Sequence, residues 1–400
     1  MYQQSRLNSD LNFFQKIKNL DFILLFCIII LSVLSFFIMY STDGGEFHYH
    51  TKSHLTKLVA FFILMLVVSF FNIKFWHLCS YFLYGIIILL LIWVSIYGIK
   101  ASGSQRWINL YFLVLQPSEL MKIGIILCLA KYYHRLNPEK VNSFVSIFVP
   151  LTLIIIPIIF VLSQPDLGTS ILIASSGLII LWLGGVKIKY FFVSLITFLI
   201  SLPFIITYLE PYQKLRILTF LDPDRDPLGA GYQIIQSKIA IGSGGLSGKG
   251  FLQGTQSYLD FLPEKHTDFI FTLFSEEFGF IGSVGLLLLY TIIVIRIIQI
   301  GAISRSSFAR MFCFGFAFAI FIYITVNLSM VLGLLPIVGS PLPIMSYGGS
   351  SMLATMIGFG IVLSAKIHSQ QTIAYIFTIL IEYNLPLPNI IFLTIKNDHE

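Results

Sequence analysis

The chain has 400 residues, of which 56% are hydrophobic and only 11% are charged. Soluble globular domains carry about 25% charged residues, so this composition excludes a water-soluble protein. The 25 Lys and Arg exceed the 19 Asp and Glu, and in a membrane protein this excess indicates basic cytoplasmic loops rather than nucleic-acid binding.

Ten apolar runs follow one another along the chain. They are residues 22–40, 55–73, 77–97, 119–133, 143–162, 168–185, 189–209, 268–296, 308–335 and 347–366. Backbone inside hydrocarbon has to satisfy its own hydrogen bonds, so each run predicts a transmembrane helix. No signal-peptide cleavage pattern follows the first run, which is therefore expected to remain as a span. The expected fold is an all-α polytopic membrane protein.

The distribution of Lys and Arg between the spans predicts the orientation of the chain. With a cytoplasmic N-terminus, thirteen of these residues fall inside and four lie in or beside the short outside loops. Both termini are therefore expected in the cytoplasm, with residues 1–21 as an N-terminal segment and 22–366 as the membrane domain. Apolar pieces of the tail, 367–400, are too short to cross, so we expect a membrane-surface segment there.

The first outside loop, residues 41–54, contains His48, His50 and His54. In an extended chain His48 and His50 face the same way, so a metal site is conceivable. Nothing in the loop fixes a fourth ligand, and we expect the cluster to be solvated.

Two further outside segments carry candidate polar residues. Arg106 and Trp107 lie in loop 98–118, where Trp107 suits an anchor at the level of the lipid headgroups. Asp166 lies in a very short turn before the sixth span, and capping of that helix is its favoured role.

Two ionisable residues open the fourth span, where a charge at membrane depth costs several kcal/mol. Glu119 and Lys122 are three positions apart, share a helical face and can neutralise each other. A structural ion pair and a direct role near a substrate both remain open for them.

The largest predicted extramembrane region is the outside loop 210–267, with 58 residues. It contains a helical pattern at 232–241 and then a glycine-rich run at 242–250. A phosphate-binding loop requires Ser or Thr after its Lys, whereas Gly250 follows Lys249, so a nucleotide site is not expected. We interpret the run as a flexible loop.

The eighth span is expected to begin at Asp268 and to carry a polar stripe. Asp268, Thr272, Ser275 and Glu276 follow the i, i+4, i+7, i+8 rule of one helical face. Such a stripe faces protein or a water-filled cavity rather than lipid. From spacing alone, Asp268 is either a helix-start carboxylate or a catalytic base.

Several segments resemble the SEDS family (shape, elongation, division and sporulation proteins). They are Ser104-Gln-Arg-Trp107, Gln116-Pro-Ser-Glu119, Gln164-Pro-Asp-Leu-Gly-Thr169, the segments 262–271 and 343–351, and the large loop after the seventh span. The resemblance covers roughly residues 20–366, in order and at family spacing. Segments 254–257 and 335–343 look more like the elongation members than the division members. The chain departs from the family in its interrupted tail and its histidine-bearing first loop, and neither touches the shared motifs.

The resemblance implies a multi-pass peptidoglycan glycosyltransferase of the cell inner membrane. Such proteins polymerise the undecaprenyl-diphosphate-linked disaccharide-pentapeptide, lipid II, on the outer face of that membrane. They work with a class B penicillin-binding transpeptidase inside a cell-elongation complex. The family's essential acidic residue falls on Asp268, its paired polar residues on Glu119 and Lys122, and its outside Arg-Trp pair on Arg106 and Trp107.

The implied reaction joins a sugar hydroxyl to the anomeric carbon that carries another unit's diphosphate. A hydroxyl is a poor nucleophile at neutral pH, so we expect Asp268 to take its proton in a direct displacement with inversion. The charge of the leaving diphosphate can be matched by basic residues or by a divalent cation, Mg²⁺ or Mn²⁺. The basic candidates are Arg106, Lys214, Arg216 and Lys238, with Lys265 and His266 just before Asp268.

Two other classes of protein are compatible with polar residues inside spans. A lipid flippase or transporter is expected to show repeated halves with helices broken at the midplane, and the sequence has no convincing internal repeat. A non-catalytic scaffold for the transpeptidase is expected to tolerate loss of Asp268.

Overall fold

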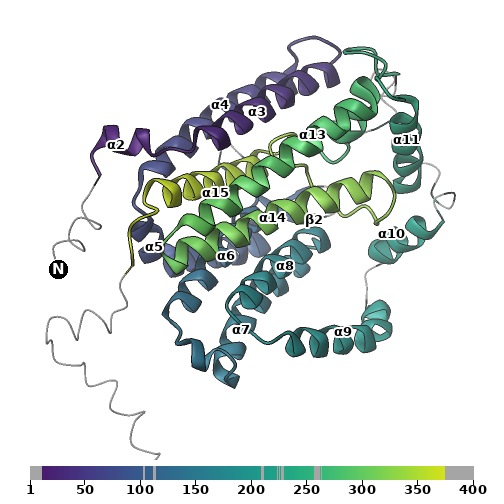
Figure 1. Cartoon of the computed structure of the whole chain (residues 1–400). Helices are drawn as coiled ribbons and strands as arrows, with labels where there is room; N and C mark the ends of the chain where they lie inside the picture. The colour runs from purple at the N-terminus through teal and green to yellow at the C-terminus, as the bar shows by residue number, and fades with distance from the viewer. Residues whose placement is uncertain are drawn as a thin grey trace, which may run out of the picture.

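The computed structural model describes residues 11–101, 104–110, 114–208, 211–222, 224, 226, 229–255, 262 and 264–373. The predicted tail 367–400 therefore lies outside the described residues from 374 onward, as do residues 1–10 of the N-terminal segment. Within the described part, a bundle of long helices makes up nearly the whole molecule (Figure 1).

Helices lie at all ten predicted runs. Their bounds are α3 (Phe22–Thr42), α4 (Tyr49–Phe70), α5 (Ile73–Tyr97), α6 (Pro117–Arg135), α7 (Phe144–Ser163), α8 (Leu167–Leu183), α9 (Ile188–Tyr208), α13 (Ile270–Ile303), α14 (Ser307–Val331) and α15 (Gly349–Ile367). Shorter helices are α2 (Phe13–Lys18), η1 (Pro138–Lys140), α10 (Pro211–Leu221) and α11 (Ala230–Ser243).

Seven of the described helices are long and apolar enough to cross a membrane. They are α3, α4, α5, α7, α13, α14 and α15. Of the other three predicted spans, α8 has only 17 residues and α6 carries several charged side chains, among them Glu119 and Lys122. These charges can be accommodated because α6 is buried on nearly every side, in contact with α5, α8, α14 and α15.

Close helix packing at the centre depends on small residues of α15. A Cβ atom at Gly358 would lie 2.2 Å from the Phe316 ring of α14, and one at Gly360 would lie 2.4 Å from Val68 of α4. Without a hydrophobic driving force between helices in lipid, such close approach is a main source of association. It holds α15 inside the bundle, where it contacts α4, α6, α13 and α14.

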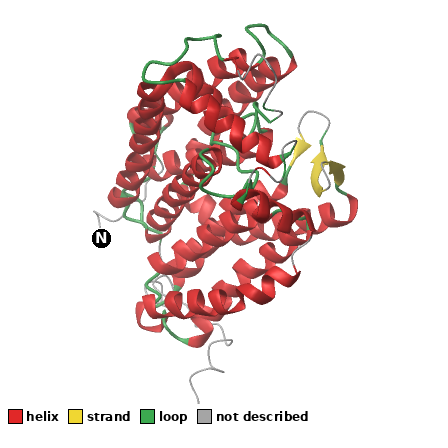
Figure 2. Ribbon diagram, turned by 90° about the vertical axis from the view of Figure 1, so that its right-hand side faces the viewer, coloured by secondary structure: helices red, strands yellow, loops and turns green. Residues whose placement is uncertain are grey.

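The expectation of an all-α fold is wrong in one place, because loop 98–118 folds into a small antiparallel sheet at the edge of the bundle (Figure 2). Strand β2 (Ser104–Asn109) pairs with β1 (Ile99–Ala101) on one side and with β3 (Val114–Leu115) on the other. Aromatic and β-branched residues such as Trp107 and Ile108 favour the pleated conformation. The short strands lie between the long helices α5 and α6, which dominate the sequence pattern.

The glycine-rich run is not the flexible loop that the sequence suggested. It packs onto a kink in α13, where Gly279 has φ +65°. The backbone N–H groups of Lys249 and Gly250 donate to the carbonyls of Glu276 and Glu277 (3.0 Å each), and those of Phe280 and Ile281 donate back to Gly245 and Leu246 (2.9 and 3.1 Å). The run thus supplies backbone partners that the broken helix lacks.

Glycine is required on both sides of this contact. A Cβ atom at Gly248 would lie 2.1 Å from the Glu277 carbonyl oxygen, and one at Gly279 would lie 2.2 Å from the Gly248 nitrogen. Both residues also have positive φ values, which residues other than glycine rarely adopt. The run is therefore an ordered part of the helix framework.

Candidate active site

A cavity of about 720 Å³ opens at the end of the bundle where α6, α8 and α15 begin. Its walls come from the start of α4, strand β2, helices α10 and α11, the turn before α13 and the segment before α15. Charged side chains from these elements converge on it. They are Lys57, Arg106, Glu119, Asp166, Arg216, Glu264 and Asp268.

Asp268 lies two residues before α13, and its turn is fixed by hydrogen bonds to the backbone. Asn327 Nδ2 donates to the Asp268 carbonyl (2.9 Å), Ser346 Oγ to the Thr267 carbonyl (2.6 Å) and the Tyr347 N–H to the His266 carbonyl (2.8 Å). The turn is therefore clamped by α14 and by the segment that leads into α15.

The side chain of Asp268 does not cap α13. The N-cap residue of that helix is Phe269, and no side-chain cap hydrogen bond is present, so a capping role for Asp268 is wrong, although the residue lies beside the start of the helix. Among the described residues no hydrogen-bond donor reaches the Asp268 carboxylate, which lines the cavity. The pKa of this carboxyl is raised to about 7, chiefly by burial and secondly by the Glu264 carboxylate, against the opposing effect of Arg216 and Arg106.

Arg106 is anchored on the short turn before α8. Its Nε and one terminal nitrogen donate to the carbonyls of Gln164 and Pro165 (3.1 and 2.6 Å), and its other terminal nitrogen lies 3.5 Å from Asp166 Oδ2. Capping by Asp166 is confirmed, because its Oδ1 accepts from the Thr169 N–H at 3.1 Å. Asp166 nevertheless also lines the cavity, where it holds Arg106 in place.

Glu119 and Lys122 form the ion pair that their spacing predicts, with 2.8 Å between Nζ and Oε1. Tyr323 of α14 donates to the other oxygen of Glu119 (2.7 Å), and Lys122 Nζ lies 4.0 Å from the centre of the same ring. Glu119 reaches the cavity wall, whereas Lys122 is buried behind it. The pair thus supports the floor of the cavity.

One wall of the cavity was missed by the sequence analysis. Lys57 of α4 lies with its Nζ 3.1 Å from the Tyr347 hydroxyl, which also contacts Ser53 Oγ at 3.1 Å. Tyr49 completes this wall. The sequence signal for this wall was Lys57 itself, a lysine inside the apolar run 55–73. It was interpreted only as a charge that bears on the orientation of the chain.

The other basic candidates divide into one that lines the cavity and four that do not. Arg216 of α10 lines it and donates to the Ile337 carbonyl (2.9 Å). Lys214 turns to the Thr207 carbonyl (2.9 Å), and Lys238 is exposed on α11. Neither Lys265 nor His266 is part of the lining.

His266 points away from the cavity toward α3 and α4. Its ring stacks on His50 with 4.3 Å between ring centres, and its Nδ1 lies 2.9 Å from Thr42 Oγ1. The expectation of a solvated histidine cluster is wrong for His54, which is buried in α4 and hydrogen-bonded to Ser35 Oγ (2.6 Å), while His48 is exposed. The loop is shorter than expected because α4 begins at Tyr49.

The polar stripe expected beyond Asp268 faces protein, and none of its other members lines the cavity. Thr272 Oγ1 lies 2.8 Å from Ser237 of α11, and Ser275 accepts a hydrogen bond from Ser283 (2.9 Å). Glu276 is fully buried and pairs with Lys249 Nζ at 2.6 Å. These residues therefore join α13 to α11 and the glycine-rich run.

The described residues contain no group of three His, Cys, Asp or Glu side chains that could hold a metal ion. Of the carboxylates that line the cavity, Glu264 already accepts from Thr267 Oγ1 (2.7 Å), and Asp166 caps α8 and faces Arg106. A divalent cation would thus have to take most of its ligands from a bound substrate.

The chain is similar to known proteins over most of its length. The family model FtsW/RodA/SpoVE, described as a cell cycle protein, matches residues 16–371. The peptidoglycan glycosyltransferase MrdB of Escherichia coli (strain K12) is 41% identical over 356 residues, which are 88% of this chain and 95% of that protein. The probable peptidoglycan glycosyltransferase FtsW of Geobacter sp. (strain M18) is 34% identical over 365 residues, 88% of this chain and 98% of that protein.

Solved structures show the same fold. A chain from a peptidoglycan synthase complex, described as coordinating polymerization and crosslinking, superposes with a TM-score of 0.75 at 32% identity and covers 87% of this chain and 97% of its own. The rod shape determining protein RodA of Thermus thermophilus superposes with a TM-score of 0.67 at 27% identity, covering 88% of this chain and 98% of its own.

Proposed function

Because the chain belongs to the FtsW/RodA/SpoVE family and is a peptidoglycan glycosyltransferase, we propose that it polymerises lipid II during cell elongation, with Asp268 as general base. The observation that carries this assignment is the Asp268 carboxylate itself. It lines a cavity that also holds Arg106 and Arg216, it is not used for capping, and its pKa of about 7 suits a proton acceptor at neutral pH.

In the proposed reaction the hydroxyl oxygen of the acceptor sugar attacks the anomeric carbon of the donor. Its proton passes to Asp268 as the new C–O bond forms, and the bond between the anomeric carbon and the diphosphate oxygen breaks. The lipid diphosphate leaves with the electron pair, and a single displacement inverts the anomeric centre. Diphosphate is a good leaving group once its charge is matched, so one carboxyl group suffices, unlike in glycoside hydrolysis.

Three cations of the cavity are suited to the diphosphate. Arg106 and Arg216 bring guanidinium groups, which match phosphate oxygens better than a lysine ammonium does. Lys57 of α4 also lines the cavity and adds a third positive charge. The sequence also predicted Lys214 and Lys238 as diphosphate-binding residues. They are not part of the proposed diphosphate site, because neither lines the cavity.

A divalent cation, Mg²⁺ or Mn²⁺, remains part of the proposal only as an additional match for the diphosphate charge. The described side chains do not form a set of ligands for it, and the proton transfer to Asp268 involves protein and sugar groups alone. No step of the reaction above depends on such an ion.

We further propose ten spans with both termini in the cytoplasm, so that the cavity opens at the outer face of the inner membrane. The bias of Lys and Arg supports this orientation. The lipid tails of both substrates then stay in the bilayer while their sugars meet at the level of Asp268. A class B penicillin-binding transpeptidase of the elongation complex is the proposed partner, supported by the fold shared with a chain of a peptidoglycan synthase complex.

The test is reconstitution of the purified protein in vesicles with labelled lipid II. We expect glycan polymer from the natural chain and a loss of at least about 100-fold with Asp268→Asn, which keeps the shape and removes the basicity. Translocation across sealed vesicles without polymer would instead indicate a flippase. Undiminished polymer synthesis by Asp268→Asn would contradict the role of this residue, and a chelator added to the natural chain tests the cation separately.

A further inference from the structure

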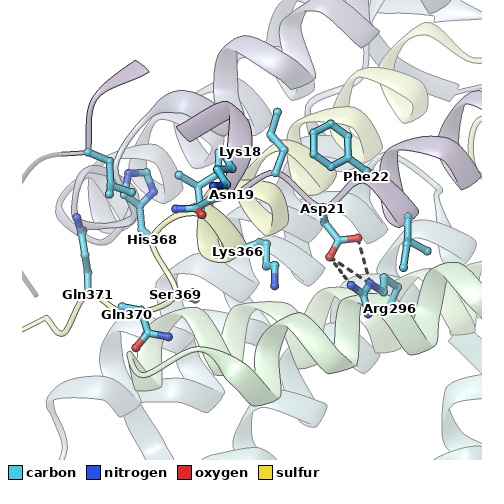
Figure 3. Close-up of a pocket in the computed structure, with 14 residues that line it drawn as sticks. Lys18, Asn19, Asp21, Phe22, Arg296, Lys366, His368, Ser369, Gln370 and Gln371 are labelled. Atoms are coloured by element: carbon cyan, nitrogen blue, oxygen red, sulfur yellow. Dashed lines mark hydrogen bonds and ion pairs between the residues drawn. The ribbon is translucent and has the colours of Figure 1, made fainter. Parts of the chain in front are cut away.

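Figure 3 shows a second cavity, of about 690 Å³. It lies at the opposite end of the bundle from Asp268. Its walls come from the junction of α2 and α3, from α13 near Arg296 and from the end of α15. Helix α15 joins the two cavities, because Gly349 lines the first and Lys366 the second. Seventeen residues of helix span about 25 Å, close to the thickness of the hydrocarbon core, so the second cavity lies at the other membrane surface.

The second cavity carries an excess of positive charge. Arg296 is compensated by the buried Asp21, with 2.9 Å between its terminal nitrogen and Oδ2 and 3.0 Å between Nε and Oδ1. Figure 3 shows this pair on one side, with Lys366 between it and the chain that follows α15. Lys18 and Lys366 pair with no acidic group among the described residues, which leaves two positive charges for a ligand.

A buried amide on the same cavity also lacks a partner. Gln371 is only 3% exposed, and neither its amide nitrogen nor its amide oxygen has a hydrogen-bond partner among the described residues. Its backbone is held in place, because the Gln371 N–H donates to the His368 carbonyl (2.9 Å) and the Arg305 N–H to the Ser369 carbonyl (2.9 Å). Burying an unsatisfied amide costs free energy, which a bound polar group would recover.

Apolar side chains lie directly beside these polar groups. Phe22 and Ile23, in the first turn of α3, line the cavity and are 61% and 53% exposed. They follow Lys18 by four and five residues and line the same cavity, so positive charge and exposed apolar surface meet there. A soluble anion would use only the first of these features, whereas a phospholipid would use both.

We propose that this cavity binds the headgroup phosphate of an anionic phospholipid from the membrane leaflet opposite the catalytic cavity. Lys18 and Lys366 contact the phosphate, Gln371 contributes its amide, and the acyl chains lie against Phe22 and Ile23. The inference depends on the membrane location of the chain and not on its polymerase activity.

The experiment measures lipid retention by the full-length protein. Protein purified from vesicles of equal parts phosphatidylglycerol and phosphatidylcholine is analysed by native mass spectrometry. We expect the natural chain to retain phosphatidylglycerol in preference to phosphatidylcholine. The double variant Lys18→Gln/Lys366→Gln should weaken retention about thirtyfold, since each lysine near an anionic lipid surface contributes about 1 kcal/mol.

The matched control is Lys140→Gln/Lys187→Gln, which removes two exposed lysines at the same end of the bundle but outside the cavity. It should retain phosphatidylglycerol as the natural chain does. Equal loss in both double variants would overturn the proposal, because it would indicate diffuse surface attraction. Displacement of the lipid by millimolar inorganic phosphate would also overturn it, since the site would then recognise phosphate alone.

Discussion

In the proposed mechanism, the ionisation of Asp268 links the surroundings of this carboxyl group to the rate of polymer synthesis. A base has to be deprotonated before it accepts a proton, and the pKa of this carboxyl is raised to about 7. We therefore expect kcat/KM for polymer synthesis to rise about tenfold per pH unit below pH 7 and to level off above it. Initial rates of the reconstituted enzyme between pH 5 and 9 measure this.

Two neighbours of Asp268 should move that pH dependence in opposite directions. The Glu264 carboxylate raises the pKa of Asp268, so Glu264→Gln should shift the acidic limb of the profile to lower pH. Arg216 lowers the same pKa, so Arg216→Gln should shift the limb to higher pH. Shifts in the same direction for both variants would mean that another group controls the profile.

Two basic residues of α10 allow a matched test of diphosphate binding. Arg216 lines the catalytic cavity, whereas Lys214, two residues earlier, turns to the Thr207 carbonyl. Loss of a charged hydrogen bond costs about 1.5–3 kcal/mol, so we expect Arg216→Ala to lower kcat/KM about 10- to 100-fold. Lys214→Ala removes the same charge from the same helix and should leave kcat/KM within about twofold. Equal losses would point to long-range attraction of the substrate.

At the scale of single elements, the kink of α13 at Gly279 is held by the glycine-rich run. The glycine-rich run supplies hydrogen bonds to both sides of Gly279, and the ion pair between the partly exposed Lys249 and the buried Glu276 closes the same contact. A buried carboxylate without a partner would be strongly destabilising, so the run and the helix stabilise each other.

Replacing each of two glycines of α13 by alanine distinguishes the contribution of the kink from the general preference of alanine over glycine in a helix. Gly279→Ala forces a side chain into positive φ and against the Gly248 backbone, so we expect it to lower the free energy of unfolding by at least about 1–2 kcal/mol. Gly285→Ala has no atom within 4 Å of the new Cβ and should be neutral or stabilising by up to about 1 kcal/mol. Thermal unfolding in detergent, followed by size-exclusion chromatography, compares the two variants. An unaffected Gly279→Ala protein would contradict the tight contact.

The helices were predictable from the sequence because long apolar runs indicate burial in lipid. The small sheet and the contact of the glycine-rich run with α13 were not predictable. Strands of two to six residues give too short an alternation to stand out between spans. The glycine-rich run has no periodicity at all, and its order comes from a helix about 30 residues further on. The Lys57–Tyr347 wall was missed for the same reason, since 290 residues separate its members and only the tertiary fold brings them together.

At the scale of the whole molecule, the two cavities define the two membrane surfaces. Helices α6, α8 and α15 begin at the catalytic cavity, and α15 ends at the second cavity. Lys18 and Lys366 lie at that second end, in agreement with the excess of basic residues expected on the cytoplasmic side. The orientation of the chain in the membrane therefore determines which leaflet each cavity faces.

That direction can be measured with two exposed residues at opposite ends of the bundle. Glu46 lies in the turn between α3 and α4, and Glu139 lies in η1 between α6 and α7. In a chain with Cys79 replaced by Ser, we expect a membrane-impermeant maleimide to label Glu46→Cys in intact spheroplasts. Glu139→Cys should react only after permeabilisation. The other three native cysteines are buried and should stay silent. The reverse labelling pattern would turn the catalytic cavity toward the cytoplasm, where extracytoplasmic glycan strands cannot be made.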